Sequence, residues 1–162
     1  MKNHRKAGGS VFANCLPLCS ISPSSVVLHR TLLDDVGCFD ESLPACEDYD
    51  LWIRITARHP VLFLGEPLVV KYGGHQDQLS QKHWGMDRFR IYALDKILRG
   101  DRLTAEQSDL VLKMLQARCR IFLQGARKRG RDDEHTLRVE NVLNHWQFDN
   151  RKDSSPRREG GA

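Results

Sequence analysis

The sequence contains no long apolar run, no paired metal-ligand motif and no strong charge of either sign. Its longest apolar candidate, residues 61–70, is interrupted by Gly65, Glu66 and Pro67, whereas a membrane-spanning helix needs about 20 apolar residues in succession. The five cysteines form no Cys-x-x-Cys pair, and no histidine stands at zinc-ligand spacing, so we expect reduced thiols. The net charge of +4 is small, and the basic runs at 127–131 and 151–158 are interpreted as solvated surface.

The N-terminal segment also lacks the features of a secretory signal. Basic residues within 2–6 precede a semi-apolar stretch, but Gly8 and Asn14 dilute its apolar character. Pro17 and Leu18 are unsuited to a cleavage site, which requires small side chains. We therefore expect no signal peptide and a cytoplasmic protein, with the inner face of the membrane as a second location.

The composition is that of a folded protein, with 40% apolar and 28% charged residues. A chain of 162 residues can form one ordinary domain, or a small domain with an appendage. We predict a first domain over 1–82, a helical appendage over 83–149 and a disordered basic tail over 150–162.

The first part of the chain alternates short apolar stretches with turn-forming residues. β-Branched residues predict a buried strand over 26–28, and further strands over 61–64 and 67–70. A helix is predicted over 30–36, with Thr31 as its cap and Gly37 ending it in a left-handed conformation.

The second part has a helical period. Apolar residues recur at helical spacing over 84–98 and again over 132–146. Between them, Thr104 and Gln107 form a capping-box pattern that predicts a long helix ending near Lys128. Together these segments predict an appendage of about three helices.

Three acidic residues, Glu47, Asp48 and Asp50, fall in the first turn of a predicted helix that ends before Pro60. Acids at this position commonly cap free backbone amides and complement the helix dipole, with no chemical role. The neighbouring sequence favours a second interpretation, because Gly-x-Phe-Asp-Glu precedes the acids at 37–41 and Leu-Trp follows them.

This combination resembles the catalytic-base segment of family 2 glycosyltransferases, in which a Gly-x-Phe-Asp-Glu turn leads into Glu-Asp-x-Asp-Leu-Trp. The match runs from Gly37 through Trp52 and covers, with its flanks, about residues 20–82. The resemblance implies an α/β fold: a truncated GT-A-like domain, that is, a partial Rossmann-like sheet with helices, followed by the helical appendage. The segment corresponds to the C-terminal, acceptor-side portion, without the nucleotide-binding half.

The resemblance also implies roles for individual residues. Asp48 is expected to be the base that accepts the proton of the acceptor hydroxyl during an inverting displacement, and Glu47 a supporting acid. Asp50 is expected to have a structural role at the helix start.

Substrate-binding and metal roles are expected outside the acidic turn. Ser24, Ser25 and Trp52 are candidates for substrate binding, although a Trp on an apolar stripe is usually a core residue. His75 resembles a histidine that reaches the metal or diphosphate, although a lone histidine beside two glycines is also an ordinary loop residue.

For the complete enzyme we expect a divalent cation, Mg2+ or Mn2+, whose main ligands lie in the absent half. The expected partners are a nucleotide-sugar donor, a glycan or lipid-linked acceptor, and the missing N-terminal half. Peripheral membrane association and self-association of the truncated chain are also expected, whereas a nucleic-acid partner is not.

The predicted function is sugar transfer with inversion in cell-surface polysaccharide or glycoconjugate synthesis, by a fragment that is inactive alone. The alternative is a non-catalytic helical interaction module, or a degenerate relic of such an enzyme, with the helices after Leu103 as the interacting part. An exposed apolar helix face would favour the alternative.

Overall fold

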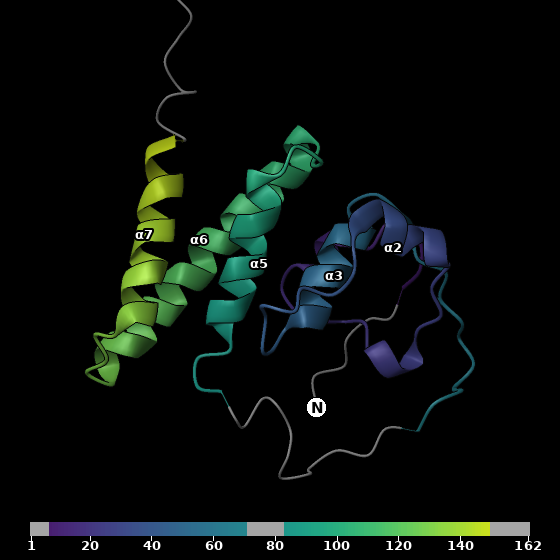
Figure 1. Cartoon of the computed structure of the whole chain (residues 1–162), viewed down its shortest axis with the longest axis horizontal. Coiled ribbons are helices and arrows are strands. Elements are labelled where there is room, and N and C mark those ends of the chain that lie inside the picture. Colours follow the sequence, from purple (N-terminus) through teal and green to yellow (C-terminus); the bar gives the residue numbers. More distant parts are fainter. Residues whose placement is uncertain (1–6, 71–82, 150–162) are drawn as a thin grey trace, which may run out of the picture.

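The computed structural model describes residues 7–70 and 83–149. Within these ranges the regular elements are all helices (Figure 1). In chain order they are α1 (Phe12–Cys15), the 3-10 turn η1 (Pro23–Ser25), α2 (Arg30–Val36), α3 (Glu47–Thr56), α5 (Asp87–Arg99), α6 (Ala105–Lys128) and α7 (Glu134–Asp149).

The α/β prediction is therefore wrong for the described residues, which contain no strand. The one β-type pairing is an isolated bridge, in which Gly9 and Val61 exchange N–H···O bonds of 2.7 and 2.9 Å. The segments predicted as strands are irregular and largely exposed: Val27 is 99% exposed and Leu62 88%. A strand exists only when a neighbouring strand satisfies its backbone groups along its length, and among the described residues the pairing stops at the single Gly9–Val61 bridge.

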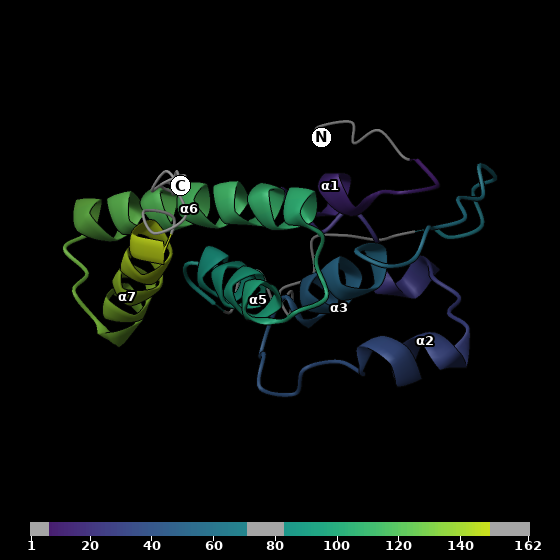
Figure 2. The same ribbon diagram turned by 90° about the horizontal axis from the view of Figure 1, so that it is seen from above.

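The last three helices run up, down and up, so that α6 packs against both α5 and α7 (Figures 1 and 2). The predicted capping box is confirmed at the start of α6. The Thr104 hydroxyl accepts the Gln107 N–H at 3.2 Å, and the Gln107 side chain accepts the Thr104 N–H at 2.9 Å. Gln107 also donates to the Ala57 carbonyl at 2.8 Å, which ties this end of α6 to the end of α3.

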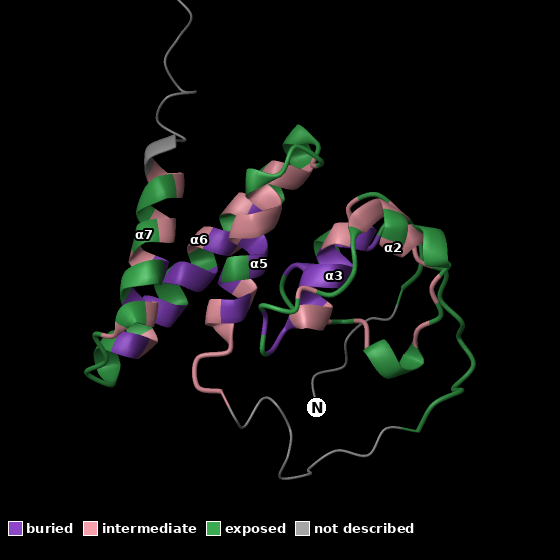
Figure 3. Cartoon of the chain, viewed as in Figure 1, coloured by how far each residue is buried: buried purple, intermediate pink, exposed green. Residues whose placement is uncertain are grey.

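Helix α3 lies between the three long helices and α2, and it is buried on both sides (Figure 3). Tyr49 and Ile53 face the main core, which includes Leu94 and Leu115 of α5 and α6. On the other side Trp52 and its neighbours form a second core with α2 and the segment before it. Apolar residues around most of a helix are typical of such an enclosed position.

Helix α2 occupies the predicted residues, and Gly37 after it has a positive φ of 84°. The predicted cap is wrong: His29 is the N-cap residue, and the Thr31 hydroxyl instead pairs with His29 Nδ1 at 2.8 Å. The predicted domain boundary at residue 82 and the tail after 149 lie outside the described residues and stay predictions.

Candidate functional site

The acidic segment begins at a strained turn. Cys46 is a non-glycine residue in the left-handed conformation, at φ 63° and ψ 20°, and it directly precedes α3. Its side chain is buried, and this burial raises the pKa of the Cys46 thiol to about 11. The thiol is therefore protonated at neutral pH, and Cys46 acts as an apolar anchor for the turn.

Asp48 is held by two donors at the start of α3. Its Oδ1 accepts the Tyr49 N–H at 2.7 Å, and its Oδ2 accepts the Cys19 thiol at 3.0 Å. Burial and the neighbouring Asp48 carboxylate raise the pKa of the Cys19 thiol far above its usual range, so the thiol is the donor. A carboxylate has about four lone-pair sites, so the half-buried Asp48 carboxylate can accept a hydrogen bond from a further donor.

Glu47 differs from its neighbour because it makes no hydrogen bond or ion pair with any residue in 7–70 or 83–149, although its side chain is half-buried. An unengaged carboxylate beside an engaged one can orient a polar ligand. That geometry is compatible with the supporting role predicted for Glu47.

Asp50 is 1% exposed and lies at the centre of a charged network. Arg54 donates to its Oδ2 from Nη2 at 2.7 Å and from Nε at 3.0 Å, and Lys96 Nζ of α5 lies 3.2 Å from the carboxylate. Arg54 also donates to main-chain carbonyls at the end of α2, including that of Cys38 at 2.8 Å. The contacts support the structural role predicted for Asp50.

The same network holds the turn before α3. Lys96 Nζ donates to Asp40 at 2.6 Å, and the Ser42 hydroxyl donates to the same carboxylate at 2.6 Å. Two hydrogen bonds, the larger contribution from Lys96 and the smaller from Ser42, lower the pKa of Asp40 to about 2. Lys96 thus connects α5 to both ends of the turn that carries the motif.

The predicted substrate-binding serines lie on the 3-10 turn η1. Their side chains are exposed, and they bond locally: Ser24 Oγ is 3.2 Å from Ser22 Oγ, and Ser25 Oγ donates to the Ser22 carbonyl at 3.0 Å. They follow Cys19 by five and six residues, so they belong to the chain segment that reaches Asp48. Their role stays a prediction.

Trp52 is 4% exposed and packs in the second core with Leu51 and Ile55. Its indole Nε1 is buried and has no hydrogen-bond partner among the described residues. The packing accounts for the apolar ring, but not for the unpaired N–H, which costs free energy when desolvated. A substrate contact for Trp52 stays a prediction.

His75 lies outside the described residues. Within 7–70 and 83–149, no group of three or more His, Cys, Asp or Glu side chains could hold a metal ion. The described residues therefore do not supply a ligand set for the expected divalent cation.

Sequence reasoning missed Cys19 and Lys96. Cys19 precedes Asp48 by 29 residues, and Lys96 follows Asp50 by 46, so neither contact has a local sequence signal. The Arg54 contacts were missed too, although Arg54 follows Asp50 at the i, i+4 spacing that favours a helical ion pair.

Among the helices in the described part of the chain, none combines the length and apolar character needed to cross a membrane.

Comparison with known proteins found two partial similarities. Over 58 residues the chain is 34% identical to an uncharacterized glycosyltransferase of Rickettsia felis and 36% identical to one of Rickettsia conorii. Each alignment covers 36% of this chain, but only 10% and 9% of the respective relative. The matched part therefore spans about a tenth of the length of these curated relatives. No protein-family model and no solved structure matches the chain.

Proposed function

We propose that this chain is the acceptor-side part of an inverting glycosyltransferase similar to those of family 2, acting in cell-surface polysaccharide or glycoconjugate synthesis. The observation that carries the proposal is the carboxylate of Asp48, which is held by Tyr49 N–H and the Cys19 thiol and has further acceptor sites that no residue in 7–70 or 83–149 occupies. Similarity to two proteins named as glycosyltransferases supports it.

In the proposed reaction, Asp48 removes the proton from an acceptor hydroxyl. The hydroxyl oxygen forms a bond to the anomeric carbon as the bond to the nucleoside diphosphate breaks on the opposite face, which inverts the configuration. Glu47 orients the acceptor. The network around Asp50 keeps the acidic turn in place, so that Asp48 does not have to be ordered when substrate binds.

The donor side of the proposed enzyme comes from residues outside those described. Residues 61–70 expose Leu62, Leu64, Leu68 and Val70 at 88, 62, 66 and 76%. Exposed apolar chain whose backbone pairs, among the described residues, through Val61 alone is suited to pairing with strands of another segment or chain. We therefore propose that a donor-binding part pairs with residues 61–70 and that the isolated chain self-associates through them.

A helical interaction module is the second candidate. Ile121 of α6 and Leu137 of α7 are 61% and 58% exposed. The exposure of these two side chains supports an interaction module, but such a module does not explain the network of charged residues around Asp50.

The test is an assay of the transferase that carries this chain together with its donor-binding part. We expect release of nucleoside diphosphate from one or more of a panel of UDP-, GDP- and dTDP-sugars, dependent on an acceptor. The anomeric proton coupling of the product, measured by NMR, should show inversion. Retention of configuration would overturn the proposal, and so would acceptor-independent release across the whole panel. The 162-residue chain alone should be inactive.

A further inference from the structure

A hollow of about 590 Å3 lies between the start of α5 and the C-terminal half of α6. Its apolar wall includes Trp84, Ile121 and Phe122, and its cationic lining is Arg90, Arg129 and Arg131. We call it the arginine hollow. A hollow with one apolar wall and several guanidinium groups fits a ligand that is both apolar and anionic.

The packing around Trp84 gives the arginine hollow a defined shape. The Trp84 ring stacks on Phe122 at 5.6 Å between centroids, and the Arg131 guanidinium lies 4.2 Å from the Trp84 centroid. Gly85 has a φ of 62°, and a Cβ at this position would come within 2.8 Å of the Phe122 ring. Glycine is thus required for the close approach that forms the wall.

Positive charge is in excess around the arginine hollow. Among the described residues that line it Asp87 is the one acid, and its carboxylate is shared by Arg90, at 3.0 Å, and by Arg118. Arg129 donates to the Gly125 carbonyl, and Arg131 Nη1 lies 4.0 Å from Asp133 Oδ2. Arg90 Nε is buried without a hydrogen-bond partner among the described residues.

The arginine hollow adjoins the acidic segment. The main-chain carbonyl of Met86, which lines the hollow, is 3.9 Å from the Cys46 thiol. Cys46 directly precedes Glu47 and Asp48, so an extended ligand could have its anionic group in the hollow and a hydroxyl near the acids.

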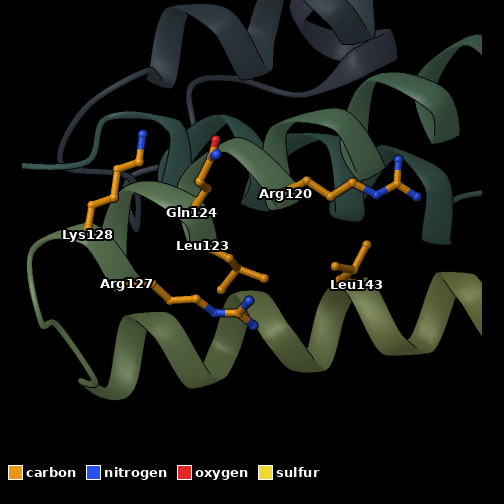
Figure 4. A pocket seen from close by; sticks show the side chains of 6 residues that line it. All are labelled: Arg120, Leu123, Gln124, Arg127, Lys128 and Leu143. Carbon is orange, nitrogen blue, oxygen red and sulfur yellow. The ribbon is translucent and has the colours of Figure 1, made fainter.

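A second, smaller hollow of about 340 Å3 lies between α6 and α7 (Figure 4). Leu123 and Leu143 form its apolar part, and Arg120, Arg127 and Lys128 surround it. It has no aromatic wall, and the side chain of Arg127 is 76% exposed. This second hollow provides a matched control of similar charge.

We propose that the arginine hollow binds the diphosphate group of an amphiphilic acceptor, with the apolar part of the ligand against Trp84, Ile121 and Phe122. Binding of a diphosphate is inferred from the lining of the arginine hollow alone. The identification of the ligand as the sugar acceptor rests on the proposed function. A bound phosphate oxygen would accept from Arg129 and Arg131, whose guanidinium groups are already oriented by Gly125 and Trp84.

Calorimetric titration with farnesyl diphosphate, inorganic pyrophosphate and farnesol tests the proposal on the full chain. Farnesyl diphosphate should bind tightest. Replacing both Arg129→Gln and Arg131→Gln should weaken its binding roughly tenfold or more, because charge-assisted hydrogen bonds are lost. The matched pair Arg120→Gln with Arg127→Gln should change it by less than about twofold, because these two arginines do not line the arginine hollow. Ile121→Ser should weaken farnesyl diphosphate but not pyrophosphate.

If both pairs of arginine substitutions weakened farnesyl diphosphate binding equally, the proposal would be overturned, because the ligand would then respond to the overall positive charge rather than to the arginine hollow. Farnesol binding as tightly as farnesyl diphosphate would overturn it too. Flotation with phosphatidylglycerol vesicles separates the two phosphate sources: binding to vesicles but not to farnesyl diphosphate would overturn the acceptor assignment and favour a lipid headgroup. The titration measures binding without a sugar donor or turnover, so a failure of the transferase proposal leaves this result intact.

Discussion

The acidic turn with α3 and the exposed segment 62–70 after it are neighbours in sequence, but they differ in structure. Residues 43–56 contribute buried side chains to the two cores and the network around Asp50 holds the turn before them, whereas residues 62–70 are exposed (Figure 3). Both are rich in apolar residues. The difference shows that apolar residues form a core only where other elements can pack against them. Of these two regions, the described residues provide such packing partners for α3 and not for residues 62–70.

The network should be the most sensitive feature of the ordered region. Asp50→Ala leaves Arg54 and Lys96 without their shared buried partner, and removing one member of a buried ion pair costs about 3–5 kcal/mol. Urea unfolding should show this loss, whereas Asp109→Ala, at an exposed site on α6, should change stability little. Equal midpoints for the two variants would contradict the role assigned to the network.

A matched pair of leucines tests the comparison directly. Leu51 in α3 is 0% exposed and Leu62 is 88% exposed. Leu51→Ala should lower the free energy of unfolding by about 2–5 kcal/mol, because it opens a cavity. Leu62→Ala should lower it by less than about 0.5 kcal/mol. Similar losses would show that residues 62–70 pack in solution as tightly as α3 does.

The cap of α6 should have a smaller effect. Thr104→Ala removes the acceptor for the Gln107 N–H and should cost about 1 kcal/mol, measured by thermal unfolding. Thr104→Ser retains the hydroxyl and should keep most of that stability. An unchanged melting temperature for Thr104→Ala would contradict this, and would mean that the Gln107 hydrogen bond to Ala57 holds this helix end without the cap.

A further effect depends on pH. The Lys96 and Ser42 bonds lower the pKa of Asp40 to about 2, so the folded state binds this proton less readily than the unfolded chain does. The resulting stability is present above the ordinary pKa of 3.8 and is lost as pH falls towards 2. In Asp40→Asn that part of the acid-induced loss should be absent. Parallel pH profiles for the two proteins would contradict the contacts assigned to Asp40.

Local signals in the sequence predicted α2, the cap of α6 and the acids at the start of α3, because each depends on residues within one or two turns. The prediction of strands at 26–28 and 61–70 was wrong. The residue types there favour strands, but a sheet also needs partner strands. The network was not predicted because Lys96 lies 46 residues from Asp50 and on another helix. The Cys19 contact to Asp48 was missed for the same reason.

The central claim, that Asp48 is the base of a sugar transfer, is tested most directly by turnover of the complete transferase with Asp48→Asn. General-base catalysis contributes about 100-fold or more, so the rate should fall by at least that factor. The matched variant Asp109→Asn should retain the wild-type rate, and thermal melts should show both proteins folded. A folded Asp48→Asn enzyme with near wild-type turnover would contradict the claim.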